Sequence, residues 1–149
     1  RETSVKLKLA VVKEAVRDKR VVVVDDSVVR GTTTRGKVRS IRKAGAKEIH
    51  MRISCPPIRY PCFYGVDFPT KKELLANERT LEEITKFLEV DSIQYLPLER
   101  MLECASLDKD SYCAACWCGK YRIPVDVSTN KFSMDRYQMR MFDEAEYDV

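Results

Sequence analysis

A run of four valines that ends in two aspartates constrains the fold of this chain more than any other feature. The stretch VVVVDDSVVRGTTTRG covers residues 21–36. Val21–Val24 is a continuous run of β-branched residues, which predicts a central, buried strand of a parallel sheet. A polar loop follows, and residues 34–44 then carry apolar side chains at helical spacing. Strand, loop and helix in this order predict an α/β fold.

The rest of the chain continues the same alternation. Residues 48–54 and 91–97 predict two further strands, and a strand–helix–strand crossover predicts parallel pairing. The three prolines between residues 55 and 65 exclude regular structure there. Two T-x-x-E capping signals predict helix starts at Thr70, running through Leu74 and Leu75, and at Thr80, whose apolar stripe is Leu81, Ile84 and Leu88. Further helices are expected within residues 1–18, from Val5, Leu9, Val12 and Val16, and at 98–105.

Composition limits the class of protein. The chain has 149 residues, enough for one domain, and a net charge of +4. Its basic residues alternate with acidic ones, which predicts a solvated surface and no nucleic-acid partner. No run of 18 apolar residues and no signal peptide is visible, so we expect a cytoplasmic protein that neither spans nor binds a membrane. Because the chain begins at Arg1 and enters a motif almost at once, we expect a piece of a longer protein.

The loop after the valine run suits a phosphorylated sugar. Ligands of α/β sheets bind at the carboxyl ends of the strands, and a helix N-terminus attracts anions. Gly31 would let the backbone approach a phosphate, and the following threonines add hydroxyl groups. Asp25 and Asp26 could accept hydrogen bonds from sugar hydroxyls or hold hydrated Mg²⁺. Two acids alone more often cap a helix, but together with this loop they favour a phosphorylated ribose.

Six cysteines add a second chemical signal. Three of them lie within CAACWC, residues 113–118. So tight a group indicates metal or redox chemistry and not disulfide bonds. The spacing C-x-x-C at Cys113 and Cys116 is typical of iron–sulfur, zinc and redox sites alike.

Several motifs resemble one family. VVVVDDSVVRGTT resembles the phosphoribosyl pyrophosphate (PRPP) motif of type I phosphoribosyltransferases. RKAGAKEIHMRISCPPIRYPCFYGVDFPTKKELLA, with VKLKL before it and YCAACWCGKY after it, resembles the glutamine phosphoribosylpyrophosphate amidotransferase family. The resemblance implies the C-terminal part of a type I parallel sheet with flanking helices over residues 1–97. It also implies a C-terminal helix, an irregular cysteine-bearing segment and a loose tail over residues 98–149.

The same resemblance implies a glycosyltransferase activity for the complete protein. Such enzymes convert PRPP, glutamine and water to 5-phosphoribosylamine, glutamate and pyrophosphate, the first step of de novo purine synthesis. A separate N-terminal glutaminase domain supplies the ammonia, so we expect this chain alone to be inactive. Purine nucleotides as feedback inhibitors and a homo-oligomer are also implied. The alternatives are a non-catalytic nucleotide-binding regulatory remnant and a metal or redox module.

Individual roles follow from the matching motifs. The resemblance implies that Lys8 is catalytic, near a mobile loop that covers the pyrophosphate, and that Leu74 lines an ammonia channel. Asp25 and Asp26 would bind ribose and Mg²⁺. The 5′-phosphate would bind to the run of residues Ser27, Val28, Val29, Arg30, Gly31, Thr32 and Thr33.

An iron–sulfur subgroup of the family accounts for part of the cysteines. The resemblance implies that Cys62, Cys113 and Cys116 bind a [4Fe–4S] cluster, whose fourth ligand lies upstream of this chain. We expect Cys55 and Cys104 to be free, and Cys118 remains open as a substitute ligand. Trp117 is expected to pack beside the cluster, and no catalytic role is expected for His50.

Overall fold

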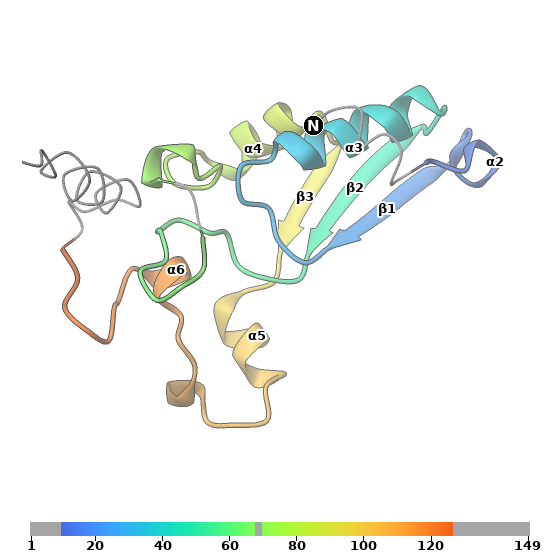
Figure 1. Cartoon of the computed structure of the whole chain (residues 1–149). Helices are drawn as coiled ribbons and strands as arrows, with labels where there is room; N and C mark the ends of the chain where they lie inside the picture. The colour runs from blue at the N-terminus through green and yellow to red at the C-terminus, as the bar shows by residue number, and fades with distance from the viewer. Residues whose placement is uncertain (1–9, 68–69, 127–149) are drawn as a thin grey trace, which may run out of the picture.

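Three parallel strands lie side by side in the order β1–β2–β3 in the computed structural model, which describes residues 10–67 and 70–126 (Figure 1). The strands are β1 (Arg20–Asp25), β2 (Glu48–Ile53) and β3 (Ser92–Tyr95). Val23 of β1 lies opposite Met51 of β2, which in turn lies opposite Ile93 of β3. The predicted parallel α/β fold is confirmed.

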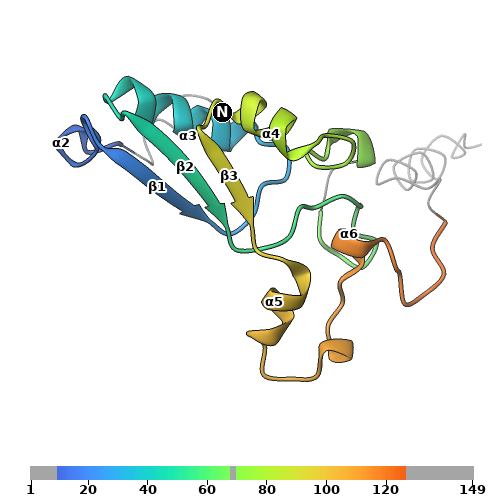
Figure 2. The ribbon, with the colours of Figure 1, turned by 180° about the vertical axis from the view of Figure 1, so that it is seen from behind.

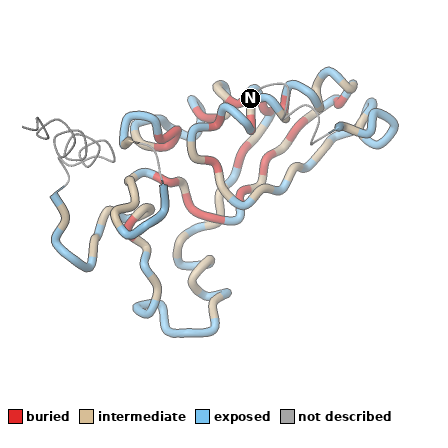
Figure 3. Tube along the Cα trace, in the orientation of Figure 1, coloured by how far each residue is buried: buried red, intermediate tan, exposed pale blue. Residues whose placement is uncertain are grey.

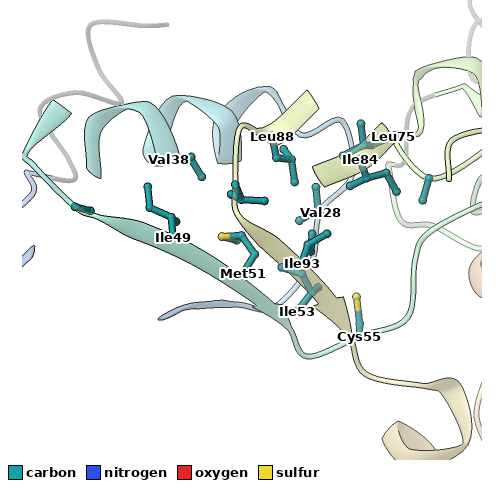
Figure 4. Packing of buried hydrophobic residues seen from close by; sticks show 13 residues of the cluster. Val28, Val38, Ile49, Met51, Ile53, Cys55, Leu75, Ile84, Leu88 and Ile93 are labelled. Carbon is teal, nitrogen blue, oxygen red and sulfur yellow. The ribbon is translucent and has the colours of Figure 1, made fainter. Parts of the chain in front are cut away.

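Two helices cover one face of this sheet, as Figures 1 and 2 show from opposite sides. They are α3 (Thr32–Lys43) and α4 (Leu81–Leu88). Val38 of α3 and Leu88 of α4 are almost fully buried, and they meet the inward side chains of β2 and β3 (Figure 4). The core therefore lies between the sheet and these helices, which leaves the carboxyl ends of the strands accessible.

The helix boundaries follow the signals in the sequence. Gly45 has a φ of 101° just after α3 ends, a conformation that glycine adopts without a steric cost. The amide of Glu83 donates to Thr80 Oγ1 over 3.2 Å, and Glu83 accepts the amide of Thr80 over 2.7 Å. The box at Thr70 is also present, but it opens a single 3₁₀ turn, η1 (Lys71–Glu73), which ends before Leu74 and Leu75.

Strand β1 differs from the expectation of a central, buried strand. Among the described residues it pairs only with β2, so it is an edge strand. Its exposure alternates, with Val22 at 59% and Val24 at 72%, because no described helix packs on their face of the sheet (Figure 3). The apolar stripe of α4 was also predicted one residue too wide, since Leu81 is 49% exposed.

The remaining elements are short. Of the helix expected within residues 1–18, the structure shows α2 (Lys13–Val16), and Val5 and Leu9 lie outside the described residues. Beyond β3 follow α5 (Leu98–Glu103), η2 (Lys109–Ser111) and α6 (Ala115–Cys118). Sequence analysis missed α6, because four residues carry no periodicity. Residues 127–149, where a loose tail was expected, are not described, and no helix in the described part could cross a membrane.

Candidate functional site

The candidate site is the loop between β1 and α3. At its start, the amide of Ser54 donates to the carbonyl oxygen of Asp25 over 3.0 Å. Near its middle, the amide of Leu75 donates to the carbonyl oxygen of Val29 over 2.8 Å. The loop is thus held by the end of β2 on one side and by the segment after η1 on the other.

The two carboxylates of the loop have different surroundings. Asp25 points toward α3, where Lys37 Nζ lies 3.2 Å from its Oδ2, and its side chain is 23% exposed. Asp26 is exposed, and its Oδ1 accepts the amide of Ser27 over 2.7 Å. The free acceptor positions of Asp26 therefore face solvent, whereas a ligand that binds Asp25 must share it with a lysine.

The predicted phosphate-binding residues fall into two groups. Arg30, Thr32 and Thr33 are exposed, at or just before the first turn of α3, where free amide groups attract anions. Val28 is 2% exposed and belongs to the core, so only its backbone could contact a phosphate. The Nε atom of Arg30 donates to Glu73 Oε1 over 3.1 Å, an exposed ion pair that a phosphate could displace.

Gly31 has a structural reason for being glycine in addition to the predicted phosphate contact. Gly31 directly precedes α3 and has a φ of 77°. This lies in the left-handed region of backbone conformation, which glycine adopts without a steric cost. A Cβ there would lie 2.8 Å from Leu75 Cδ2 and 3.0 Å from Phe87 Cε1. Its missing side chain therefore makes room for the core, and the approach of its backbone to a phosphate stays a prediction.

Two predicted residues stay without a geometric test. Leu74 is buried at 1% exposure and precedes the residue that bonds Val29, so it lies close to the loop. Whether it lines a channel for ammonia stays a prediction. Lys8 lies outside the described residues.

The structure brings the cysteine-bearing segment against the proline-rich loop. The carbonyl oxygen of Cys116 accepts the amides of Arg59 and Tyr60, each over 3.0 Å. The hydroxyl of Tyr121 donates to the carbonyl oxygen of Pro61 over 2.8 Å. Cys62 belongs to this proline-rich loop, and the bonds hold the loop against residues 113–121 (Figure 1).

Aromatic rings close this contact. Gly119 lies so close beneath Tyr60 that a Cβ there would be 2.9 Å from the ring. The ring of Tyr121 packs edge-on against Phe63, with centroids 5.2 Å apart, and against Tyr64, at 6.1 Å. Beside these rings Cys62 and Cys116 are half-buried, whereas Cys113 is exposed.

The thiols of this region influence one another. Burial, followed by the nearby Cys62, raises the pKa of Cys116 to about 11, and Cys113 and Cys55 contribute less. Within residues 10–67 and 70–126, no three His, Cys, Asp or Glu side chains are close enough to hold one metal ion. The [4Fe–4S] cluster at Cys62, Cys113 and Cys116 therefore stays a prediction. Cys104 and Cys118 are exposed.

Sequence analysis gave no sign of one further feature. An open groove of about 310 Å³ lies at the carboxyl ends of the three strands, lined by Val24, Arg52 and Tyr95 among others. His50 lies on the same face of β2, with Nδ1 2.8 Å from Ser92 Oγ and Nε2 3.0 Å from Glu48 Oε2. Both ring nitrogens of His50 are thus engaged in the sheet, away from the loop.

The sequence of this chain is similar to those of known proteins. The chain is 46% identical over 136 residues to an amidophosphoribosyltransferase of Methanothermobacter thermautotrophicus. It is 53% identical over 131 residues to that of Methanocaldococcus jannaschii. Over this matched length, the chain belongs to the amidophosphoribosyltransferase family. The match takes in 91% and 88% of the chain but only 29% and 27% of these relatives. No family model matches the chain.

Two solved structures have a fold similar to that of this chain. The glutamine PRPP amidotransferase from B. subtilis, complexed with ADP and GMP, is 38% identical with a TM-score of 0.73. The match includes 87% of this chain and 30% of the B. subtilis protein. A structure described as the allosteric regulatory enzyme of purine biosynthesis is 42% identical with a TM-score of 0.70. That match includes 77% of this chain and 26% of the solved chain.

Proposed function

We propose that this chain supplies the PRPP-binding loop of an amidophosphoribosyltransferase. The observation that carries the proposal is the loop itself: Asp26, Thr32 and Thr33 are exposed where β1 ends and the 12-residue helix α3 begins. Amide groups at the start of such a helix and small hydroxyl side chains suit a 5′-phosphate. Carboxylates at the strand end suit the ribose hydroxyls.

The reaction proposed for the complete enzyme transfers nitrogen to ribose. Ammonia released from glutamine forms a bond to C1 of PRPP as the bond from C1 to the pyrophosphate oxygen breaks. Pyrophosphate leaves with the electron pair, and the nitrogen loses one proton to solvent. Charge therefore develops on the leaving group, where cations lower the barrier.

The residues of this chain bind and orient the substrate in that step. Asp26 accepts hydrogen bonds from the ribose, and the start of α3 holds the phosphate. Lys37, next to Asp25, adds positive charge near the strand end. Asp25 and Asp26 would hold Mg²⁺, which supplies neutralisation of the pyrophosphate. The catalytic role of Lys8 and the ammonia channel at Leu74 rest on the family resemblance.

The test uses the complete enzyme with an ammonium salt in place of glutamine. Replacing Asp25 and Asp26 together by Asn should abolish pyrophosphate release from PRPP and leave the circular dichroism spectrum unchanged, since Asp26 is exposed and Asp25 loses only a partly exposed ion pair. Charge-assisted hydrogen bonds of this kind contribute about 1.5–3 kcal/mol each. Unchanged kinetics would contradict the proposal, and binding of purine nucleotides without PRPP turnover would favour the regulatory alternative.

We also propose a [4Fe–4S] cluster held by Cys62, Cys113 and Cys116. The bonds from the proline-rich loop to Cys116 and the aromatic rings around them support it. Iron and acid-labile sulfide should be found in anaerobically purified longer enzyme, and Cys62→Ser should lower both. Cys104→Ser, which changes an exposed thiol at the end of α5, is the matched control and should retain them. Stoichiometric zinc in a colourless protein would contradict the cluster.

The wider roles rest on the relatives. Feedback by purine nucleotides is proposed because the B. subtilis protein is complexed with ADP and GMP. A cytoplasmic location, a homo-oligomer and a boundary between residues 97 and 98 stay predictions.

A further inference from the structure

Glu73 accepts hydrogen bonds on both of its carboxylate oxygens. Its Oε1 atom accepts a bond from Nε of Arg30 over 3.1 Å. Its Oε2 atom accepts one from the amide of Thr70 over 3.1 Å and one from the Thr70 hydroxyl over 2.9 Å. A single carboxylate thus connects the loop between β1 and α3 with the start of η1. The Thr70 hydroxyl first, and Arg30 to a smaller degree, lower the pKa of Glu73, so the group is ionised at neutral pH.

The second capping box of the chain shows that capping alone does not require this arginine. At the start of α4, the amide of Thr80 donates to Glu83 Oε2 over 2.7 Å, as the amide of Thr70 does to Glu73. Within residues 10–67 and 70–126, no arginine donates a hydrogen bond to Glu83. The two glutamates therefore have the same capping role, and Glu73 has an additional contact with the loop.

The residues after Glu73 hold the same loop at two further points. The amide of Leu75 donates to the carbonyl oxygen of Val29 over 2.8 Å. The Cδ2 atom of Leu75 lies only 2.8 Å from the position that a Cβ of Gly31 would take. Leu75 is 1% exposed and belongs to the core (Figure 4). Three consecutive loop residues thus contact one short segment whose backbone is fixed by burial, and Glu73 is presented from that segment.

Arg30 keeps donors for a ligand while it is bonded to Glu73. A guanidinium group has five N–H donors, and Glu73 accepts the one on Nε. The two Nη groups of Arg30 donate to nothing else among the described residues, and the side chain is 48% exposed. Arg30 directly precedes Gly31 and the first turn of the 12-residue helix α3. A phosphate at this helix start could therefore bind the Nη groups while Glu73 retains Nε.

We propose that Glu73 is a positioning residue that fixes the guanidinium of Arg30 for the 5′-phosphate of PRPP. This role rests on the proposed function. A free, exposed arginine loses rotamer freedom when it binds a phosphate, and Glu73 imposes part of that loss before the substrate arrives. The 5′-phosphate takes no part in bond breaking at C1, so the gain is equal in the ground state and the transition state. It lowers KM for PRPP and leaves kcat unchanged.

The test measures pyrophosphate release by the complete enzyme with an ammonium salt at varied PRPP concentration. Glu73→Ala should raise KM for PRPP about two- to fivefold at an unchanged kcat, the range of a partly exposed ion pair. Glu73→Gln should raise it less, because its amide oxygen can still accept one of the bonds. In an Arg30→Ala background, Glu73→Ala should have no further effect on KM, since the group that it positions is already absent.

Glu83→Ala is the matched control. It removes the same kind of capping carboxylate from α4, where no loop arginine is bonded. It should lower the thermal midpoint, since the capping box of α4 is lost, and leave KM for PRPP unchanged. A general loss of helix capping is thereby separated from the positioning of Arg30.

Three results would overturn the role of Glu73 and leave the proposed function standing. A lower KM in Glu73→Ala would show that the phosphate displaces Glu73 from Arg30. An unchanged KM, or a rise by the same factor with and without Arg30, would show that Glu73 only supports the fold. If Glu73→Ala does not fold, Glu73→Gln in both backgrounds gives the same comparison. Wild-type complete enzyme that releases no pyrophosphate from PRPP would overturn the proposed function itself.

Discussion

Lys37 Nζ lies 3.2 Å from Asp25 Oδ2, so the first carboxylate of the loop is paired before any ligand binds. The pair is partly exposed and comes from α3 and β1, the two elements that the loop connects. Metal or ribose that binds Asp25 must therefore compete with this lysine.

Removing the charge of Lys37 should strengthen the binding of Mg²⁺ to Asp25. In the complete enzyme, Lys37→Met should lower the Mg²⁺ concentration for half-maximal pyrophosphate release about two- to fivefold, the range expected from a partly exposed ion pair. Lys37→Arg keeps the charge and should behave like the wild type. An unchanged Mg²⁺ dependence in Lys37→Met would show that Asp25 does not hold the metal.

Gly31 and Gly36 give a matched pair of substitutions at one helix. Gly31→Ala puts a methyl group 2.8 Å from Leu75 Cδ2 at a φ of 77°, and it should destabilise the chain by about 1–3 kcal/mol. A Cβ added to Gly36 would meet no neighbouring segment within 4 Å, so Gly36→Ala should stabilise α3 by about 0.5–1 kcal/mol. Urea unfolding followed by circular dichroism measures both, and equal effects would contradict the packing assigned to Gly31.

Glu89 should make stability depend on pH in the acid range. Hydrogen bonds first from Arg39 and then from Arg35 lower its pKa from 4.5 to about 2. Because the folded state has the lower pKa, the stabilisation is fully present above about 4.5 and is lost as the pH falls toward 2. Glu89→Gln should melt at a lower temperature than wild type at pH 7, and the gap should close below pH 4.5. A gap that is constant across this range would refute the assignment.

The thiol of Cys55 should react slowly with alkylating reagents. Its pKa of about 11 leaves little thiolate at pH 8, and it is buried. Cys104 is exposed and should be labelled before Cys55. Mass spectrometry of peptides after a short pulse of iodoacetamide measures the order, and labelling of Cys55 as fast as Cys104 would contradict the burial. Urea should remove the difference.

Local patterns predicted the elements well, and for physical reasons. The boxes at Thr70 and Thr80 depend on side chains three residues apart, so the sequence contains every partner they need. The valine run predicted a strand correctly but not its surroundings, because exposure of Val22 and Val24 depends on what packs on that face. The residue pattern within the strand carries no information about that packing.

For the candidate site, the position of the loop was predictable but its contacts with distant segments were not. The order of acids, glycine and threonines placed the loop at the end of β1, where the structure has it. Contacts between distant segments were not predictable, since Arg59 and Cys116, whose backbone groups form a hydrogen bond, are 57 positions apart in the sequence. Gly31 shows a second limit, because its close packing against Leu75 and Phe87 follows from the tertiary structure and not from its own sequence neighbourhood.

The free edge of β1 determines where the end of a further strand of the sheet would lie. Away from β2, the backbone N–H and C=O groups of β1 have no strand partner within the described residues, and such groups pair with a strand of almost any sequence. A strand added there in parallel would end beside Asp25 and Asp26. Side chains that follow such a strand would therefore lie next to these two aspartates, on the side that faces away from β2.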